Sequence, residues 1–255
     1  MLGNLIGKGN TAEVYEWGQD QVIKLFKEGY PSDAVEKEYR NALAVAQFNF
    51  DKPGVYARAE WEGRAGIIYE KLQGMTLLEW IMKTGEAEVC GEILAEEHSK
   101  ILSNKVEGVK AHKDILRYNI NQAHELEESL REKILEALDK LPDGDNLCHG
   151  DFHPGNIILH KDRRIIIDWM NVCSGHPYSD IARTIYLIDM TPIPREIEDV
   201  EGFLRFRSKA VDVYLRNMGV ARSDIEEWLP VIVAGRLGDG CGAAEVKEII
   251  RFLNK

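Results

Sequence analysis

The chain has 255 residues and more acidic than basic side chains, 43 Asp and Glu against 32 Lys and Arg, which leaves a net charge of −11. Hydrophobic residues make up 44% and charged residues 29%, a balance typical of a globular protein and not of a disordered or fibrous one. Binding to nucleic-acid phosphates needs a basic surface, so we expect no nucleic-acid partner. No apolar run approaches the roughly 20 residues that cross a bilayer, and no signal pattern opens the chain, so we expect no membrane partner.

The cysteines indicate the cellular compartment. Cys90, Cys148, Cys173 and Cys241 are widely spaced, and no two of them form a Cys-x-x-Cys pair. This spacing is not typical of a disulfide framework or of a zinc site. We therefore expect free thiols and a cytoplasmic protein.

The first seventy residues predict strands around one helix. β-branched and aromatic residues are enriched in four short runs, Val14–Trp17, Gln21–Phe26, Val55–Trp61 and Ala65–Glu70. Between the second and third runs, Pro31 precedes a segment whose apolar residues recur at helical spacing up to Ala46.

The pattern changes to helices after Gln73-Gly74. Apolar stripes at helical spacing continue to the end of the chain, interrupted by one β-rich hairpin, Ile157–Leu159 and Ile165–Ile167. This order predicts an α+β fold with a small β-rich N-terminal lobe, residues 1–72, and a larger α-helical C-terminal lobe, residues 73–255. Ligands often bind in a cleft between two such lobes.

A group of polar residues surrounds this hairpin. Asp151 and Asn156 are separated by four residues in the loop before it, and Asp168 follows its second strand. One carboxylate on such a loop can serve as a base, and an amide oxygen with a second carboxylate can bind Mg²⁺. The alternative is that Asp151 and Asn156 only make hydrogen bonds within the loop. His149 has no Cys or His partner at zinc spacing, so we expect it to be structural.

Two further features concern phosphate binding. Gly7 and Gly9 lie among small residues between apolar flanks, so the backbone there could approach phosphate groups, although an ordinary glycine turn explains the same residues. Lys24 stands in the middle of an apolar strand, where its charge is unfavourable unless a partner neutralises it. The alternative is a solvent-facing lysine on an edge strand.

A partner for Lys24 is expected on the helix that follows Pro31. Glu36 and Glu38 both flank the apolar stripe of that helix, each about 80° from its centre. Helical geometry therefore does not choose between them. Glu36 could also pair with Arg40, one turn further along the same helix.

These residues resemble the motifs of a known family. The glycine loop, Lys24, the helix glutamate and the segment His149–Asn156 (His-Gly-Asp-Phe-His-Pro-Gly-Asn) are similar to those of eukaryotic-like kinases. With Ile166–Trp169 and Gly175–Arg183, they resemble the aminoglycoside phosphotransferase and choline kinase-like family over nearly the whole chain. The resemblance implies a bilobal protein-kinase-like fold that uses ATP and Mg²⁺.

The resemblance also implies roles for individual residues. Asp151 would orient the substrate hydroxyl or accept its proton, and Asn156 and Asp168 would hold Mg²⁺. Lys24 would contact the α- and β-phosphates of ATP. Its partner would be Glu38, the second position of the family's Glu-x-Glu arrangement.

Supporting roles follow from the same resemblance. Ile67–Gly74 is similar to the linker that holds adenine through backbone groups, so the Glu70 carbonyl and the Leu72 amide are expected to face adenine. Asp180 would brace the catalytic loop. His98 lies on an apolar helix face, and this position predicts a buried histidine with hydrogen-bond partners.

The chain also departs from the protein-kinase pattern. His149-Gly150-Asp151 stands where protein kinases have His-Arg-Asp, no Ala-Pro-Glu motif is present, and only eleven residues separate Asp168 from Asp180. So short a segment favours an open pocket over a docked peptide. We therefore predict transfer of the γ-phosphate of ATP to a hydroxyl of a small molecule. The alternatives are an atypical protein kinase and a non-catalytic nucleotide-binding regulator on a kinase scaffold.

The negative charge is concentrated in residues 72–148, which hold 9 basic and 16 acidic side chains. Solvated helix faces explain such a run of charge. The alternative is an acidic wall near the ligand cleft, which would select a cationic substrate such as an amino-sugar or an amino-alcohol.

Overall fold

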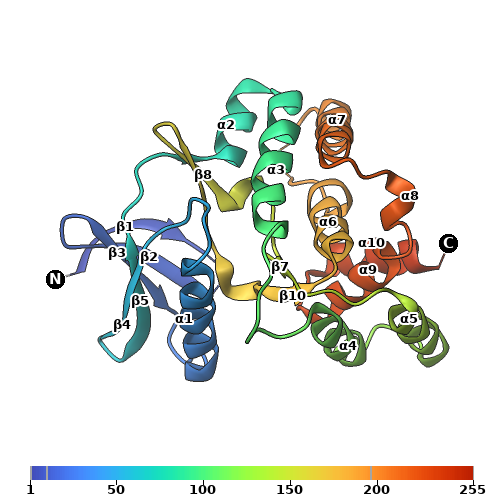
Figure 1. Cartoon of the computed structure of the whole chain (residues 1–255), viewed down its shortest axis with the longest axis horizontal. Helices are drawn as coiled ribbons and strands as arrows, with labels where there is room; N and C mark the ends of the chain where they lie inside the picture. The colour runs from blue at the N-terminus through green and yellow to red at the C-terminus, as the bar shows by residue number, and fades with distance from the viewer. Residues whose placement is uncertain (1, 10, 196, 255) are drawn as a thin grey trace. The chain divides into compact units, whose positions relative to one another are not determined.

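A computed structural model of the chain describes residues 2–9, 11–195 and 197–254 (Figure 1). The contacts within the chain divide it into two compact units. The first unit comprises Met1–Leu77 and Gly155–Asn171, and the second comprises Leu78–Pro154 and Val172–Lys255. The hairpin of residues 155–171 therefore belongs to the first unit although it follows much of the second unit in the sequence.

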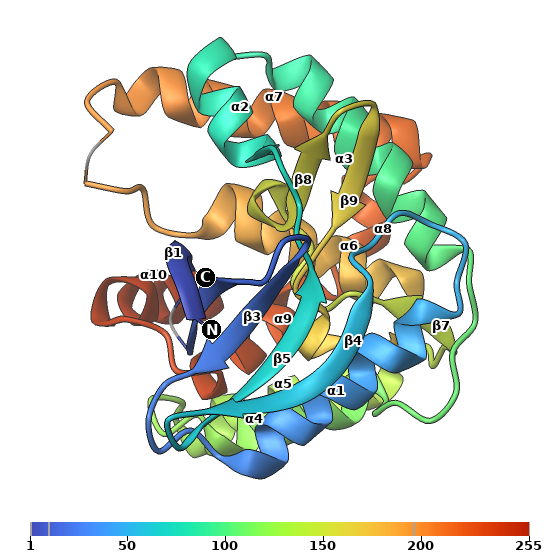
Figure 2. The ribbon, with the colours of Figure 1, turned by 90° about the vertical axis from the view of Figure 1, so that its left-hand side faces the viewer.

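The first unit contains a five-stranded antiparallel sheet in the order β1-β2-β3-β5-β4. Its strands are β1 (Leu2–Lys8), β2 (Ala12–Trp17), β3 (Gln21–Phe26), β4 (Val55–Trp61) and β5 (Arg64–Glu70). One helix, α1 (Ser32–Ala46), packs against β4 and β5 (Figure 2). The four predicted strands and the predicted helix are confirmed, and β1 is a strand that the sequence did not predict.

Apolar side chains of the sheet and of α1 form the core of the first unit. Phe26 of β3, Val35 of α1 and Ile67 of β5 are almost completely buried in one cluster. Burial of side chains of this size contributes roughly 1.5–3 kcal/mol each. The cluster fixes the face that α1 turns to the sheet, and Glu38, one turn after Val35, is buried on that face.

A second, three-stranded antiparallel sheet in the first unit has the order β6-β8-β9. Its strands are β6 (Met75–Thr76), β8 (Ile157–His160) and β9 (Arg163–Ile166). A short helical turn precedes β8, η1 (Pro154–Asn156), and another follows β9, η2 (Trp169–Asn171). The predicted hairpin is therefore present, and α1 packs against η2 at its end.

The second unit is mainly helical. Its helices are α2 (Leu77–Thr84), α3 (Ala87–Leu102), α4 (His112–Gln122), α5 (Glu128–Lys140), α6 (Pro177–Ile185), η3 (Tyr186–Met190), α7 (Val200–Met218), α8 (Arg222–Ile225), α9 (Leu229–Gly238) and α10 (Ala243–Leu253). Two short antiparallel strands accompany them, β7 (Asn146–Cys148) and β10 (Cys173–Gly175). The centre of this unit is α6, in which Ser179–Ile185 are all buried. Around it, α3 packs on α7 and α4 packs on α9 (Figure 1).

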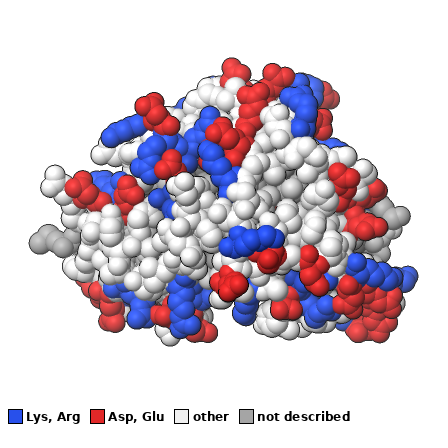
Figure 3. Space-filling model, viewed as in Figure 1, with Lys and Arg blue, Asp and Glu red and all other residues white. Residues whose placement is uncertain are grey.

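The acidic stretch of residues 72–148 forms α2 to α5 and the loops between them. Many of its carboxylates lie in exposed ion pairs, which are Glu96 with Lys100, Glu128 with Arg131, Asp139 with Arg117, Asp143 with Lys113 and Asp145 with Lys105. On the face shown in Figure 3, acidic and basic side chains lie next to one another. Each of these pairs joins an acidic and a basic residue of the same stretch, so the pairs do not change its excess of acidic side chains. Within the part of the chain that the structure describes, no helix is long and apolar enough to cross a bilayer.

Candidate active site

The first unit brings two predicted site residues, Glu38 and Asp168, together around a third, Lys24. The Nζ atom of Lys24, on β3, lies 2.7 Å from Oε1 of Glu38 on α1 and 3.1 Å from Oδ1 of Asp168. The Lys24 side chain is 17% exposed and that of Glu38 only 3%, whereas Asp168 is 35% exposed. Asp168 is therefore the most exposed member of this cluster, Lys24 is partly exposed and Glu38 is buried.

The same geometry decides which glutamate is the partner of Lys24. Glu38 makes the ion pair, whereas the Glu36 carboxylate pairs with Arg40 and Arg58 on the exposed side of α1. The hydroxyl of Tyr69 donates a hydrogen bond of 3.4 Å to Oε1 of Glu38. This last contact was not predicted, because nothing in the local sequence indicates that β5 faces α1 at this residue.

The two carboxylates keep Lys24 charged. Burial disfavours the ammonium form, but the charges of Asp168 and Glu38 outweigh burial and hold the pKa of Lys24 above its ordinary value. Burial acts in the opposite sense on Glu38, whose pKa it raises in spite of the charge of Lys24. Its Oε2 atom is buried and has no hydrogen-bond partner among the described residues. The cluster thus holds the ammonium group of Lys24 between a buried carboxylate, Glu38, and a more exposed one, Asp168.

Asn156 and Asp168 lie at the same end of the β8–β9 hairpin. Ile157 pairs with Ile166 in the register of the two strands, and the backbone N–H of Ile167 donates to the Asn156 carbonyl at 2.9 Å. Asp168 has a left-handed backbone with φ of +66°, a conformation that non-glycine residues adopt mainly where the surrounding structure enforces it, often at functional sites.

The chemistry of these two side chains fits Mg²⁺. Asn156 supplies an amide oxygen and Asp168 a carboxylate, and Mg²⁺ is held by one or two such protein oxygens together with substrate phosphates and water. Among the described residues no group of three or more His, Cys, Asp or Glu side chains could hold a metal alone.

The predicted glycine loop connects β1 and β2. Gly7 lies within β1 opposite Val14, one residue before the strand ends at Lys8, and in the loop the backbone N–H of Gly9 donates to the Ala12 carbonyl at 2.9 Å. Neither glycine has a positive φ, and a Cβ atom at Gly7 would make only ordinary contact with Val14. The local backbone therefore does not require glycine at position 7, and its role toward phosphates stays a prediction.

Glu70 and Leu72 lie at the C-terminal end of β5. The Glu70 side chain accepts a hydrogen bond from the Gly54 backbone at 3.0 Å, and its own N–H donates to the Gly54 carbonyl at 2.8 Å. These bonds fix the end of β5 against the start of β4. The role of the Glu70 carbonyl and the Leu72 amide toward adenine stays a prediction.

In the second unit, the loop that carries Asp151 is held by one buried carboxylate. Oδ2 of Asp180 accepts the backbone N–H of His149 at 2.6 Å, and Oδ1 accepts that of Gly150 at 2.9 Å. Gly150 has a φ of +77°, which favours glycine at the residue before Asp151. Asp180 thus braces the loop as predicted, and it does so through backbone groups.

His98 completes this support from α3. Its Nε2 atom lies 3.0 Å from Oδ2 of Asp180, its Nδ1 atom lies 2.6 Å from the Tyr214 hydroxyl, and its ring stacks on Phe152. Burial alone would raise the pKa of Asp180, but the hydrogen bond from His98 and the neighbouring histidines hold it well below its usual range. His98 is therefore buried and hydrogen-bonded, as expected, while the participation of Tyr214 was missed because only tertiary packing brings α7 there.

Asp151 itself is ionised at neutral pH. Burial would raise the pKa of its carboxyl, but the nearby His153 and the positive charge of Arg183 outweigh burial, so the pKa is lowered. The Nε2 atom of His153 lies 3.8 Å from Oδ2 of Asp151. A partly exposed carboxylate that is free of its proton can accept one from a hydroxyl group.

Comparison with known proteins shows the family and the fold of the chain. A family model described as the phosphotransferase enzyme family (APH) matches residues 3–214. A curated relative, acyl-CoA dehydrogenase family member 11 of Pongo abelii, is 33% identical over a stretch that covers 34% of this chain and 12% of that protein. The chain thus spans only a small part of this relative's length.

Solved structures share the fold over almost the whole chain. The apo form of a thermostable mutant of aminoglycoside phosphotransferase APH(4)-Ia has a TM-score of 0.67 and 15% identity, covering 99% of this chain and 94% of that one. The streptomycin–ATP–APH(2")-IIa ternary complex has a TM-score of 0.61 and 16% identity, covering 100% and 90%. Amicoumacin kinase hAmiN, in complex with AMP-PNP, Ca²⁺ and Ami, has a TM-score of 0.58 and 18% identity, covering 98% and 86%. The predicted kinase-like fold, with a β-rich N-terminal part and a helical C-terminal part, is therefore confirmed.

Proposed function

Because the chain belongs to the phosphotransferase enzyme family, we propose that it transfers the γ-phosphate of ATP, together with Mg²⁺, to a hydroxyl group of a small molecule. The observation that carries the proposal is the cluster of Lys24, Glu38 and Asp168. It holds a positive charge and a reachable carboxylate 3.1 Å apart, as a site for a phosphate–metal complex requires.

We assign nucleotide binding to residues 1–72 and acceptor binding and catalysis to residues 73–255. Lys24 would bind the α- and β-phosphates, and the backbone at Gly7 and Gly9 would cover the phosphate chain. Asn156 and Asp168 would hold Mg²⁺, which supplies positive charge against the phosphate oxygens.

Asp151 is proposed to act on the acceptor. Its carboxylate would orient the acceptor hydroxyl and take its proton while that oxygen forms a bond to the γ-phosphorus. The bond from the γ-phosphorus to the bridging oxygen breaks, and ADP leaves. Because the transition state of phosphoryl transfer is loose, positioning and charge stabilisation supply most of the rate. The acceptors to screen first are amino-alcohols, amino-sugars and other hydroxyl compounds, with ATP consumption as the readout.

The Asp151→Asn variant tests this assignment. On an acceptor found in the screen, we expect turnover to fall by roughly 10²–10⁴-fold, because the base is lost. Nucleotide affinity should stay unchanged, since Asp151 is not among the proposed nucleotide ligands. Asp162→Asn, in the exposed turn between β8 and β9, is the matched control and should retain full turnover. Wild-type turnover in Asp151→Asn would refute the role of this residue. Nucleotide binding without transfer to any acceptor would favour a regulator, and transfer only to proteins would favour an atypical protein kinase.

A further inference from the structure

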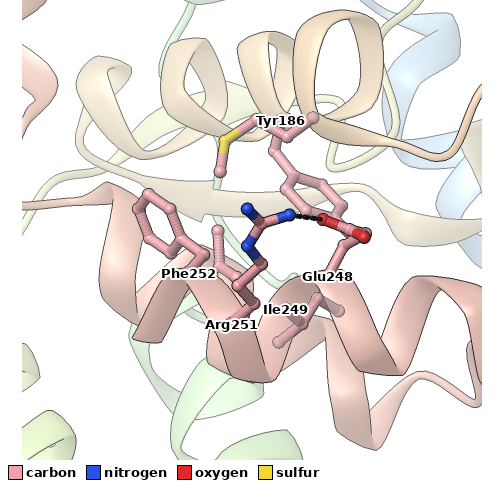
Figure 4. A pocket seen from close by; sticks show the side chains of 7 residues that line it. Tyr186, Glu248, Ile249, Arg251 and Phe252 are labelled. Atoms are coloured by element: carbon pink, nitrogen blue, oxygen red, sulfur yellow. Dashed lines mark ion pairs between the residues drawn. The ribbon is translucent and has the colours of Figure 1, made fainter. Parts of the chain in front are cut away.

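A cavity of about 270 Å³ lies among η3, α9 and α10 of the second unit (Figure 4). The polar groups of its lining have partners on the same helices. Nη1 of Arg251 lies 3.8 Å from Oε2 of Glu248, and the Tyr186 hydroxyl donates to Glu245 at 2.7 Å. Tyr186 and Ile249 are almost completely buried, so they offer a ligand almost no surface. The cavity is therefore a gap between packed helices and not a ligand site.

In the first unit, residues 70–74 form a linker between β5 and β6, and the second half of this linker is fixed to β8. The backbone N–H of Gln73 lies 3.0 Å from Nδ1 of His160, the last residue of β8. The Gln73 carbonyl oxygen lies 2.6 Å from the same nitrogen. Directly after the linker, β6 pairs with β8 as an antiparallel strand. The chain is thus attached to β8 from Gln73 onward.

The ring of His160 can hold Gln73 in either of its tautomers. When Nδ1 carries no proton, it accepts the Gln73 N–H, and when it is protonated, it donates to the Gln73 carbonyl. Both groups of Gln73 belong to the backbone, so the bond does not depend on the side chain at position 73. His160 is therefore the side chain that joins the linker to β8.

The next residue, Gly74, brings the backbone of the linker into direct contact with β8. A Cβ atom at Gly74 would lie 2.1 Å from the Leu159 carbonyl oxygen and 3.4 Å from Cγ2 of Ile158. A backbone carbonyl within a strand cannot turn away, so this close approach needs glycine. The contact at Gly74 and the hydrogen bond from His160 are adjacent, and together they fix the linker against the end of β8.

The first half of the linker is held by the five-stranded sheet. The backbone N–H of Lys71 donates to the Asp20 carbonyl at 3.0 Å, and Nζ of Lys71 lies 2.7 Å from Oε1 of Glu16 on β2. Leu72, whose amide we expect to face adenine, lies between Lys71 and Gln73. The sheet thus holds Leu72 from one side, and β8 holds it from the other.

The same strand, β8, also leads to the proposed metal residues. Asn156 directly precedes β8 and His160 ends it, so the two are four residues apart, or about 14 Å along an antiparallel strand. On the neighbouring strand, Ile166 pairs with Ile157 next to Asn156, and Asp168 follows Ile166 by two residues. One strand of fixed length therefore connects the linker with the residues proposed to hold Mg²⁺.

We propose that His160 is a positioning residue for the nucleotide. Through the Gln73 backbone it holds the linker where the Glu70 carbonyl and the Leu72 amide bind adenine, at a constant distance from the residues that bind the metal and the phosphates. It acts through the linker and takes no part in phosphoryl transfer. This inference rests on the proposed function, because it assumes that the linker binds the adenine of ATP.

The test compares two ligands of the full chain in the presence of Mg²⁺, ATP and inorganic tripolyphosphate. ATP needs both the linker and the phosphate site, whereas tripolyphosphate needs only the phosphate site. In His160→Ala we expect the affinity for ATP to fall about fivefold, the effect of one lost hydrogen bond, and the affinity for tripolyphosphate to stay within about twofold. Calorimetric titration measures both. With an acceptor found in the screen, KM for ATP should rise while kcat stays unchanged.

Further variants separate the hydrogen bond from the bulk of the side chain. His160→Phe keeps a ring but lacks Nδ1, so it should behave as His160→Ala does. The amide of His160→Asn can accept the Gln73 N–H and donate to its carbonyl, so it should restore the affinity for ATP. His124→Ala, the same change at an exposed histidine between α4 and α5, is the matched control and should bind both ligands as the wild type does. Hydrogen exchange of residues 70–76 without nucleotide should be faster in His160→Ala and His160→Phe only.

The outcomes distinguish this inference from the proposed function. If the wild type binds ATP and both His160→Ala and His160→Phe bind it equally well, the inference is wrong while the proposed function stands. An equal loss of affinity for ATP and tripolyphosphate would also overturn it, because the effect would not then act through the linker. Unchanged hydrogen exchange of the linker would show that His160 does not hold it. If the wild type binds neither ligand, the proposed function fails, and the positioning role fails with it.

Discussion

At the scale of single residues, burial separates two glutamates that are alike in the sequence. Glu38 lies on the face of α1 that turns to the sheet, where its carboxylate meets Lys24, whereas Glu36 faces Arg40 and Arg58 near solvent. A hydrogen bond to a buried charged group contributes about 1.5–3 kcal/mol, and an exposed ion pair contributes at most about 1 kcal/mol. Substitution of Glu38 should therefore affect the protein much more than substitution of Glu36.

The prediction compares Glu38→Gln with Glu36→Gln. Loss of the Glu38 charge should leave Lys24 held by Asp168 alone, so the phosphate site is less well ordered and ATP affinity falls by roughly tenfold or more. Glu36→Gln, with the same chemical change two residues away, should bind ATP as the wild type does. Titration with a fluorescent ATP analogue measures both. A Glu38→Gln variant with wild-type affinity would show that this ion pair does not order the site.

The sequence indicates the candidate site residues more directly than it indicates the residues that support them. Asp151, Asn156 and Asp168 stand in short motifs whose spacing is local, so a single loop and hairpin reveal them. Tyr69 and Tyr214, which hydrogen-bond to Glu38 and His98, are brought there by strands and helices distant in the sequence. Only the packed chain determines such contacts, and a helical wheel could not distinguish Glu36 from Glu38.

At the scale of elements, α3 and α7 approach each other at Gly91. A Cβ atom there would lie 2.5 Å from the Ala210 carbonyl oxygen and 2.9 Å from the Tyr214 backbone nitrogen. These are backbone atoms of α7 and cannot turn away. The same two helices carry His98 and Tyr214, so their separation also sets the hydrogen bond that supports Asp180 and, through it, the loop that carries Asp151.

Gly91→Ala should therefore destabilise the protein although alanine favours a helix. Overpacking of this kind costs typically 1–3 kcal/mol, more than the gain in helix propensity of about 1 kcal/mol. Thermal and urea unfolding measure the difference. Gly242→Ala is the control, because a Cβ atom at Gly242 would have nothing within 4 Å and its φ is negative, so its stability should stay close to that of the wild type. Equal stability of Gly91→Ala would mean that the two helices can separate freely.

Elements were predictable where the residue pattern is local and strong. β2 to β5 and the β8–β9 hairpin have runs of β-branched and aromatic residues, and they were found. β1 contains Gly3, Gly7 and polar residues, and much of it is exposed, so its strand character comes from pairing with β2 and not from its own composition. The membership of residues 155–171 in the first unit is equally a property of tertiary contacts, which no local pattern contains.

At the scale of the whole molecule, buried titratable groups couple stability to pH. His112 on α4 is buried, and its Nδ1 atom lies 2.8 Å from the Ser179 hydroxyl, which itself donates to the His176 carbonyl. Burial lowers the pKa of His112 from 6.5 to about 4 in the folded protein. Asp180 affects stability in a lower pH range. Its pKa in the folded protein lies below the ordinary carboxyl value, so the stability that it contributes is lost only as the pH falls below about 4.

The effect of His112 on stability should appear between pH 6.5 and about 4, above the pH range in which Asp180 acts. Above pH 6.5 the imidazole is neutral in the folded and the unfolded chain, so its contribution to stability is complete. Between pH 6.5 and about 4 the unfolded chain binds a proton that the folded chain does not, and the free energy of unfolding falls, by up to about 3 kcal/mol at 1.36 kcal/mol per pH unit. In His112→Gln the side chain can still donate to Ser179 but does not titrate, so its stability should depend less steeply on pH in this window. Urea unfolding at pH 7, 5.5 and 4.5 gives the dependence of the unfolding free energy on pH for the wild type and for His112→Gln. Equal dependence in the two proteins would contradict a neutral, buried His112.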